Sequence, residues 1–426
     1  MRVVKLAMCA LAFAAGTRGA KAGAVINVPA DHPTIQAAVD AASPGDTISV
    51  APHVYKEQVV VSGKPGLVLQ ATGKPGKVVI DAGYADGVGL LVTNSADVAV
   101  SGFTVRKTTV AGIEVQNSDR AHVDACVVLA ARGAGVFCDG GDSVIVTNCT
   151  VVSPRKDGVD LGTSSSPITN GRVQGCTIKG AGADGIVVFG SGDEISQNTV
   201  TAAKADGIAL DPQGVGDNCS VHDNTVAKAK HFGIVVGGNG HTVKSNTVTN
   251  AGDEGIELDG TFIETSSNTV KNSNNFAIVS NGNDGNLHDN TVTAGRHDGI
   301  LNDGVRAAIT SNTVSKVKGK GIFLTGGATV SGNTVTSGGY GVYAQAASTV
   351  SGCTATKCAY GFYAARSNCT FDGNTATSCT NGFVAKGEMN TFTNDTATTS
   401  RKFDLDDQSG GTTNTYAGNT FTKHRP

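Results

Sequence analysis

Acidic side chains recur at fixed distances from a repeated glycine in the middle of this sequence. They stand directly before the glycine, or two or four residues after it: Asp160, Asp184, Asp206, Asp211, Glu254, Glu257 and Asp259. Lys230 and His231 interrupt the series between its aspartates and its glutamates. Carboxyl groups beside an imidazole can transfer protons as general acids and bases, and groups rich in carboxylate oxygen can bind Ca²⁺.

The glycine itself recurs through most of the 426-residue chain. Four consecutive steps, from Gly233 to Gly321, are 22 residues long, and all the steps are between 20 and 27 residues. The fourteen positions are Gly87, Gly112, Gly135, Gly158, Gly185, Gly207, Gly233, Gly255, Ala277, Gly299, Gly321, Gly341, Gly361 and Gly382. A repeat of this length is typical of a solenoid, in which each unit packs only on its neighbours. We therefore expect one long stack rather than several globular domains.

Strand alternation assigns each residue near the glycine to one side of its strand. Apolar residues one and three positions after the glycine, such as Ile208 and Leu210, should face the core. The acidic residues should then share one solvent-facing side of the stack. Two interpretations stay open. Asp before Gly is a common turn sequence. Carboxylates within or just after strands are disfavoured, however, and these indicate a functional face: Asp160, Asp211, Glu257 and Asp259.

A second phrase, Asn-Thr-Val, precedes the glycine by nine residues in six consecutive units, from Asn198 to Asn312. Asn accepts left-handed backbone geometry and can hydrogen-bond its neighbours above and below, so we expect a stacked Asn ladder at a corner. Three cysteines occupy the same position and should be small buried residues of that ladder: Cys126, Cys149 and Cys176. Cys358 and Cys379 also fall on neighbouring units, and whether they form a disulfide is left open.

The first 22 residues have the features of a secretory signal peptide. Arg2 and Lys5 form a basic start, residues 6–15 are a short apolar run, and residues 20–22 are a small-x-small cleavage sequence. We therefore expect residues 1–22 to be removed and the mature protein to be secreted or periplasmic.

The charge and hydropathy of the remaining chain exclude two classes of partner. Residues 1–22 contain four basic and no acidic residues, so their removal changes the formal charge from −3 to −7. An acidic surface gives no electrostatic basis for binding nucleic acid. No stretch after residue 22 reaches the roughly 18 apolar residues of a membrane span.

Residues 25–60 are expected to cap the N-terminal end of the stack. Residues 34–42 have apolar side chains at helical spacing after Pro33, which predicts a short amphipathic helix. Residues 28–42, 44–48 and 54–57 resemble the N-terminal cap of right-handed parallel β-helix proteins, the pectate-lyase-like superfamily.

This resemblance implies an all-β fold, a single-stranded right-handed parallel β-helix of about 14 coils with a short N-terminal capping helix. The mature chain, residues 23–426, would be one domain. Its repeats would fill residues 61–387, and an irregular coil or cap would follow over residues 388–426. The superfamily includes polysaccharide lyases, glycoside hydrolases, uronan epimerases, phage tailspikes, adhesins and NosD-type periplasmic proteins. The fold resemblance therefore does not specify an activity.

A more local resemblance concerns the coils that carry Asp211. Residues 208–213 and 221–234 resemble the active-site coils of mannuronan C5-epimerases, and Asp211 and Pro212 match that family's Asp-Pro. The sequence departs from the family at Ile208 and Gln213, where the family has tyrosine and histidine, and it lacks the arginine expected in the next coil. These departures put epimerase chemistry in doubt.

The resemblance implies a catalytic role for Asp211, with Lys230 and His231 completing a rearranged site. The remaining acidic residues would bind substrate: Asp160, Asp184, Asp206, Glu254, Glu257 and Asp259. No metal-site spacing is present, and the nine His and three Met are too scattered to support a copper role. No cofactor is required, although Ca²⁺ could bridge the acidic face to an acidic polymer.

Two functional hypotheses follow. The first is a secreted enzyme that acts on polysaccharide, an acidic uronate polymer above all, by lyase-like or epimerase-like chemistry. The second is a non-catalytic surface or matrix protein that binds glycans or acts as a stiff spacer. Polysaccharide is the expected partner in both, and the oligomeric state is open.

Overall fold

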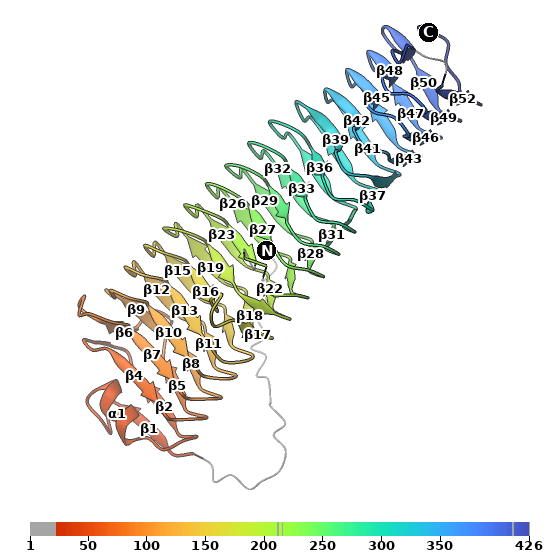
Figure 1. Cartoon of the computed structure of the whole chain (residues 1–426). Coiled ribbons are helices and arrows are strands. Elements are labelled where there is room, and N and C mark those ends of the chain that lie inside the picture. The colour runs from red at the N-terminus through yellow and green to blue at the C-terminus, as the bar shows by residue number, and fades with distance from the viewer. Residues whose placement is uncertain (1–22, 211–212, 215, 411–412, 426) are drawn as a thin grey trace, which may run out of the picture.

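The computed structural model describes residues 23–210, 213–214, 216–410 and 413–425, and these form one elongated stack of short strands (Figure 1). The chain winds through three parallel sheets in turn, here called sheets A, B and C, and each strand pairs with its equivalents in the preceding and following coils. Among the described residues, no helix is long and apolar enough to span a membrane.

Sheet A has 18 strands, one in each coil. They are β1 (Val25–Val28), β2 (Thr47–Val50), β5 (Val68–Ala71), β8 (Ala99–Ser101), β11 (His122–Asp124), β14 (Ile145–Thr147), β18 (Arg172–Gln174), β22 (Glu194–Ser196), β25 (Ser220–His222), β28 (Thr242–Lys244), β31 (Glu264–Ser266), β34 (Asn286–His288), β37 (Ala307–Thr310), β40 (Ala328–Ser331), β43 (Thr349–Ser351), β46 (Thr370–Asp372), β49 (Thr391–Thr393) and β52 (Thr415–Ala417).

Sheet B has 16 strands and follows sheet A in each coil. They are β3 (His53–Tyr55), β6 (Val78–Asp81), β9 (Thr104–Arg106), β12 (Val127–Leu129), β15 (Thr150–Val152), β19 (Thr177–Lys179), β23 (Thr199–Thr201), β26 (Thr225–Ala227), β29 (Thr247–Thr249), β32 (Thr269–Lys271), β35 (Thr291–Thr293), β38 (Thr313–Ser315), β41 (Thr334–Thr336), β44 (Thr354–Thr356), β47 (Thr375–Thr377) and β50 (Thr396–Thr398).

Sheet C contains the strands that begin at the repeated glycine. They are β4 (Val59–Ser62), β7 (Leu90–Thr93), β10 (Ile113–Gln116), β13 (Val136–Asp139), β16 (Val159–Leu161), β20 (Ile186–Val188), β24 (Ile208–Leu210), β27 (Ile234–Val236), β30 (Ile256–Leu258), β33 (Ile278–Ser280), β36 (Ile300–Asn302), β39 (Lys320–Leu324), β42 (Tyr340–Ala344), β45 (Tyr360–Ala364), β48 (Asn381–Ala385), β51 (Phe403–Asp407) and β53 (His424–Arg425). A small extra sheet pairs β17 (Ile168–Thr169) with β21 (Gly190–Ser191).

The N-terminal end of the stack is covered by the short helix α1 (Ile35–Ala41), as the sequence predicted (Figure 1). The hydroxyl of Thr34 accepts the backbone N–H of Ala37 and so caps the helix. The carboxylate of Glu57 accepts the N–H groups of Ile35 and Gln36, both at 2.9 Å. The helix therefore satisfies its first amide donors and shields the edge of the first coil.

The stack has about 18 coils rather than the 14 that the glycine repeat indicated, because the end coils lack the glycine. The strand register places Gln58 and Asp404 at the glycine position of the first and last regular strands of sheet C. The register also corrects one member of the series, since Gly89 rather than Gly87 aligns with Gly112. Beyond residue 387, strands β49, β50 and β51 still pair in register with the coil before them.

The recurring glycine is required by the close approach of neighbouring coils. A Cβ atom at Gly207 would lie 2.2 Å from Cγ1 of Val226 in sheet B and 2.4 Å from the carbonyl oxygen of Gly233 in the next coil. Both distances are far below van der Waals contact. Larger residues at this position would therefore force the coils apart, which explains the narrow choice of residue along the repeat.

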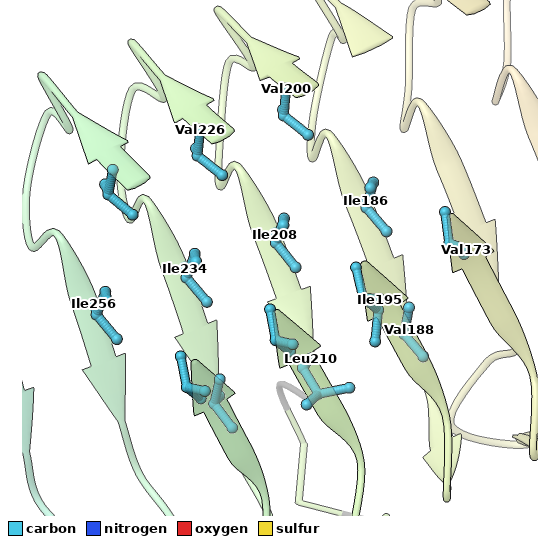
Figure 2. Packing of buried hydrophobic residues seen from close by; sticks show 14 of the residues in the cluster. Val173, Ile186, Val188, Ile195, Val200, Ile208, Leu210, Val226, Ile234 and Ile256 are labelled. Carbon is cyan, nitrogen blue, oxygen red and sulfur yellow. The ribbon is translucent and has the colours of Figure 1, made fainter. Parts of the chain in front are cut away.

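The core consists of aliphatic residues stacked in register between the sheets. Ile208, Ile234 and Ile256 follow one another along sheet C and point inward with Val200 and Val226 of sheet B (Figure 2). All five are at most 1% exposed. The predicted inward positions, one and three after the glycine, are thus confirmed.

The predicted Asn ladder forms at the corner between sheets A and B. The side-chain oxygen of Asn268 accepts both the backbone N–H of Asn246 at 2.9 Å and its side-chain amide at 3.0 Å. The side-chain amide of Asn268 donates to the carbonyl of Val243 at 2.8 Å. Each asparagine thus satisfies backbone groups that would otherwise be buried without partners.

The cysteines extend this corner as buried thiols. The backbone N–H of Cys176 donates to the Asn198 side chain at 2.8 Å, so Cys176 adjoins the ladder. All nine cysteines of the described chain are buried and carry free thiols, which answers the open question about Cys358 and Cys379.

Candidate functional site

The outer face of sheet C, opposite the core, carries two kinds of side chain. Strands β10 to β30 bear most of its carboxyl groups, and we call the coils that contain them the acidic coils. Strands β39, β42 and β45 bear aromatic side chains, and we call their coils the tyrosine coils. In both groups the outward residues stand directly before the glycine, or two or four residues after it.

The aspartates directly before the glycine have a structural task. Asp157 accepts the backbone N–H of Asp184 at 2.9 Å, and Asp184 in turn accepts that of Asp206 at 2.8 Å. Asp206 accepts the N–H of Phe232 at 3.1 Å. Each carboxylate thus ties one coil to the next. The turn interpretation accounts for these aspartates, because their positions are fixed by the backbone that they bond.

Asp160 differs from these aspartates because its carboxyl lacks a partner. It occupies the central outward position of β16, and its Oδ1 atom is buried without a hydrogen bond from the described residues. Burial raises the pKa of Asp160 to about 8, and the negative charges of Asp157, Asp139 and Asp184 add to this rise. Asp160 is therefore protonated at neutral pH and can donate a proton.

A pocket of 270 Å³ opens beside Asp160 on the outer face. Its walls include Ala111, Ala134, Phe137, Lys156, Asp157 and Asp160. The apolar wall explains the burial of the carboxyl, and Lys156 places a cation beside the two acids. Thr163 lies at the rim of this pocket.

Larger hollows elsewhere lack such a carboxyl. The 510 Å³ hollow at the cap contains Glu57, which already bonds the amides of α1. The 440 Å³ hollow over sheet A contains Arg306, which pairs with Asp284 at 2.6 Å. The pocket beside Asp160 is therefore the more reactive of these sites.

Two further carboxyls near Asp160 were missed in the sequence. Glu114 and Asp139 lie on the two preceding coils, and each has a buried oxygen without a hydrogen bond from the described residues. Burial also raises the pKa of Glu114. The signal was available, because Glu114 stands two residues after Gly112 and Asp139 stands four after Gly135.

His231 lies close enough to Asp184 and Asp206 for its charge to act on both. Burial raises the pKa of Asp184 to about 6 and raises that of Asp206, while His231 opposes both shifts. Lys230 and His231 are exposed in the connection between β26 and β27. Asp211, the predicted catalytic residue, lies outside the described residues, and so does Pro212.

An apolar cluster separates these aspartates from the glutamates. Val187, Ala209 and Val235 occupy the central outward positions of β20, β24 and β27 and are at most 7% exposed. Phe189 and Phe232 pack against them. The predicted acidic face is therefore divided into two groups rather than forming one continuous column.

The second acidic group consists of Glu254, Glu257 and Asp259, and the side-chain amide of Asn281 links two of its carboxylates. The side chain of Asn281 donates to Asp259 at 2.7 Å and to Glu257 at 3.2 Å. Asn275 donates to Glu254 at 2.5 Å. Burial raises the pKa of Glu257 to about 7, and the charges of Asp259 and Glu254 add to the rise.

The tyrosine coils carry an aromatic surface that the search for catalytic motifs missed. Tyr340 stacks on Tyr360 with ring centroids 4.8 Å apart, and Tyr343 stacks on Tyr363 at 5.0 Å. Phe323 meets Tyr343 edge to face. We call these five residues the tyrosine surface. The sequence signal was the phrase Tyr-Gly-x-Tyr, which occurs in two consecutive units.

Two family models match the sequence. The model described as periplasmic copper-binding protein (NosD) matches residues 69–236 and 328–425. The chain belongs to this family. The model of the right-handed β-helix region matches residues 206–354 of the same NosD-family chain, which confirms the expected fold. A search of curated proteins gave no match.

Solved structures confirm the fold of the NosD-family chain at low sequence identity. A mannuronic acid specific polysaccharide family 6 lyase from human gut microbiota is 13% identical, with a TM-score of 0.55 over 78% of this chain and 86% of the lyase. The PL6 family alginate lyase AlyGC is 11% identical, with a TM-score of 0.52 over 93% of this chain and 75% of the lyase.

The donor groups of this NosD-family chain do not fit the copper of the family description. No group of three or more His, Cys, Asp or Glu residues in the described ranges is placed to hold a metal ion. The cysteines, which would be the soft ligands for copper, are buried in the core and its corners. No reaction step is therefore assigned to copper.

Proposed function

We propose that this NosD-family protein binds an extended polysaccharide along the outer face of sheet C and acts on it at the pocket of Asp160. The observation that carries the proposal is the buried carboxyl of Asp160, whose Oδ1 atom has no hydrogen bond from the described residues and which borders a pocket on a long, straight sheet. A straight parallel sheet offers room for several sugar units in a row. The similar solved structures include two lyases, one of them an alginate lyase, and that likeness favours a uronate polymer as the substrate.

The pocket contains the three groups that lyase or epimerase chemistry on a uronate requires. Lys156 would neutralise the carboxylate of the sugar, which makes the proton at C5 more acidic. Asp157 would remove this proton as general base. In elimination, the electron pair of the C5–H bond forms a double bond between C4 and C5, the bond from C4 to the glycosidic oxygen breaks, and Asp160 protonates that oxygen. In epimerisation, Asp160 would instead return a proton to the opposite side of C5.

The raised pKa values reduce the repulsion between an acidic face and an acidic polymer. Asp160, with its pKa of about 8, is neutral at pH 7, and Glu257, with its pKa of about 7, is about half neutral. Ca²⁺ bound between Glu257, Asp259 and the polymer would reduce the repulsion further. We therefore include Ca²⁺ in the test as a variable.

The residues predicted from the epimerase resemblance stay a second candidate centre. His231 and Lys230 would act there with Asp211, and the candidate is supported by the effect of His231 on the charges of Asp184 and Asp206. The substitution His231→Ala separates the two centres, because it should abolish turnover only if chemistry occurs there.

A non-catalytic glycan-binding protein is the alternative function. It is favoured by the structural use of the aspartates before the glycine, since Asp157, Asp184 and Asp206 each bond the backbone of the next coil. In that case the acidic coils would serve stability and solubility, and the outer face would bind polysaccharide without changing it.

Incubation of the protein with alginate, polygalacturonate and neutral glucans, with and without Ca²⁺, tests the proposal. Unsaturated products absorb in the ultraviolet, and NMR detects epimerised residues. We expect product from a uronate polymer, and a loss of product with Asp160→Asn but not with Asp289→Asn, which changes an exposed aspartate beside sheet A. Binding without product on any polymer would favour the non-catalytic alternative, and neither binding nor product would refute both.

A further inference from the structure

The tyrosine surface is half-exposed on the outer face of sheet C, about 40 Å from Asp160 at ~4.8 Å per coil. It contains four of the seven tyrosines of the chain. Within each stacked pair the rings are inclined by 16° or less, and the two pairs meet nearly at right angles. The surface is therefore a rigid patch with rings in two orientations.

The core of these coils does not need the outer tyrosines. Phe362 stacks on Phe383 inside the solenoid with centroids 4.9 Å apart, and Phe371 stacks on Phe392 at 5.0 Å. All four phenylalanines are fully buried. The coils thus already have an internal aromatic ladder. The second set of stacked rings, on the solvent side, is therefore not needed for packing and indicates a binding surface.

The hydroxyl groups of the outer tyrosines are available to a ligand. Elsewhere in the chain, Tyr55 donates its hydroxyl to the carbonyl of Ala51 at 2.9 Å, and Tyr416 donates to Asp407 at 2.7 Å. The hydroxyls of the tyrosine surface have no such partner among the described residues. A ring with a free hydroxyl combines apolar contact with hydrogen bonding, which suits a sugar ring.

The charge of the chain changes sign before the tyrosine coils. Residues 134–303 contain 20 Asp and Glu and ten Lys and Arg, a formal charge of −10. Residues 304–402 contain nine Lys and Arg and three Asp and Glu, a formal charge of +6. The tyrosine surface therefore lies in the basic part of an otherwise acidic protein.

Two lysines border the tyrosine surface. The Nζ atom of Lys320 lies 3.9 Å from the centroid of the Phe323 ring and 5.2 Å from that of Tyr343. Lys386 is exposed and stands two residues after Val384, the register partner of Tyr363. Strand alternation places Lys386 on the same side as Tyr363. The Nζ atom of Lys320 also lies 3.5 Å from Oδ2 of Asp298, so a carboxylate-bearing sugar on the rings would share Lys320 with Asp298 at one end and meet Lys386 at the other.

We propose that the tyrosine surface is the main anchoring subsite for an anionic polysaccharide, with Lys320 and Lys386 recognising its carboxylates. This inference rests on the proposed function, because it assumes that the ligand is a polysaccharide. It assigns the attraction for the acidic polymer to the basic coils and leaves the acidic coils to the chemistry. Charge complementarity favours this ligand over a neutral polymer.

The test compares the binding of alginate, polygalacturonate and a neutral glucan at low and high NaCl. The double variant Tyr343→Ala with Tyr363→Ala should weaken the binding of the anionic polymers about tenfold, because two aromatic contacts with the sugar rings are lost. Tyr343→Phe with Tyr363→Phe should keep most of the affinity. The matched control, Thr334→Ala with Thr354→Ala, changes paired residues of sheet B in the coils of Tyr343 and Tyr363 and should have no effect.

The other possible results of the binding test distinguish this inference from the proposed function. Unchanged binding by the alanine variant, with wild-type binding intact, would overturn the inference and leave the proposed function standing. Binding that depends on the tyrosines, without turnover on any polymer, would support the inference and count against chemistry at Asp160. If the neutral glucan bound as tightly as the anionic polymers and salt did not weaken its binding, the proposal that the ligand is anionic would be rejected. Self-association that the variant abolishes, without polymer binding, would identify a second copy of the chain as the occupant.

Discussion

The acidic coils and the tyrosine coils use the same positions of the same repeat for opposite purposes. Asp160 and Tyr343 both stand two residues after the glycine, at the centre of an outward strand face. Around Asp160 the neighbours raise the pKa of a carboxyl and leave one oxygen unpartnered. Around Tyr343 they stack further rings and add a lysine.

The difference between the acidic coils and the tyrosine coils shows how one solenoid can carry different side chains at equivalent positions along its length. Glycine, aliphatic core residues and the Asn ladder keep every coil alike, so an outward residue can change without disturbing the backbone. In our proposal, one end of the outer face carries out proton transfer and the other attracts an anionic chain. Function here depends on which side chains are grafted on the scaffold rather than on the fold.

The largest expected effect comes from removing the proton donor of the acidic coils. Asp160→Asn should lower turnover by roughly 100-fold or more, since general acid catalysis contributes about 10²–10⁴-fold. The affinity for the polymer should be nearly unchanged, because the anchoring residues lie in the tyrosine coils. Initial rates and equilibrium binding measured on the same preparation check both parts. If Asp160→Asn lost affinity for the polymer but kept its turnover number, Asp160 would belong to the binding surface rather than to the catalytic site.

The same substitution should change stability in a pH-dependent way. The pKa of Asp160 is raised from 3.8 to about 8 in the folded protein, so the folded state holds the proton more tightly than the unfolded chain. The stability that this proton supplies is complete below pH 3.8 and is lost as the pH rises to about 8.

Asp160→Asn should therefore unfold like the wild type at pH 4 and be more stable at pH 9, on the order of 5 kcal/mol. Thermal unfolding at the two pH values measures the difference. Tyr343→Phe, in the tyrosine coils, is the comparison and should show no such pH dependence. An equal effect of Asp160→Asn at both pH values would show that Asp160 is not held in its protonated form.

A smaller effect of the same sign is expected at the second acidic group. Glu257→Gln removes a carboxyl whose pKa is raised to about 7 and keeps a group that can hydrogen-bond Asn281. Stability above pH 7 should rise by about 1 kcal/mol, less than at Asp160 because the pKa shift is smaller. If Ca²⁺ binds there, added Ca²⁺ should stabilise the wild type more than the variant. A Ca²⁺ effect of the same size in both proteins would place any bound Ca²⁺ elsewhere.

The smallest expected effect concerns Lys386, which follows β48 in the coil next to the tyrosine coils. Lys386→Gln should weaken the binding of an anionic polymer only a few-fold, because exposed ion pairs contribute about 0.2–1 kcal/mol. High salt should remove the difference from the wild type. Lys316→Gln makes the same charge change at the end of β38 in sheet B and serves as control. Equal losses for the two variants would indicate a general charge effect rather than a subsite.

Much of the fold could be predicted from the sequence because its repeat is strict. The spacing of Gly207 and Asn198 placed the core strands and the ladder, since each position has a steric or hydrogen-bonding requirement. The coil number was too low because Gln58 and Asp404 replace the glycine at the ends. The roles of the acidic residues could not be separated, because only the structure shows that Asp184 bonds the next coil, whereas Oδ1 of Asp160 is buried without a hydrogen bond from the described residues.

The tyrosine surface was overlooked for a different reason. Its signal, the phrase Tyr-Gly-x-Tyr, was present, but the predicted site rested on acidic residues and on the Asp-Pro of the epimerase resemblance. A column of outward residues has to be followed over all coils before its chemistry can be judged. Glu114 and Tyr363 lie on the same outward face, at opposite ends of it, and neither belongs to a known catalytic motif.

Hydroxyl-radical labelling of tyrosines with and without a bound uronate oligomer tests the central claim most directly. Binding along the outer face of sheet C should protect Tyr340, Tyr343, Tyr360 and Tyr363 from modification. Tyr84 is 46% exposed and lies far along the stack, so its labelling should stay unchanged and report on the radical dose. Protection of the four tyrosines with unchanged Tyr84 is the predicted result. If saturating oligomer left the labelling of all five tyrosines unchanged from that of the free protein, the result would contradict the account.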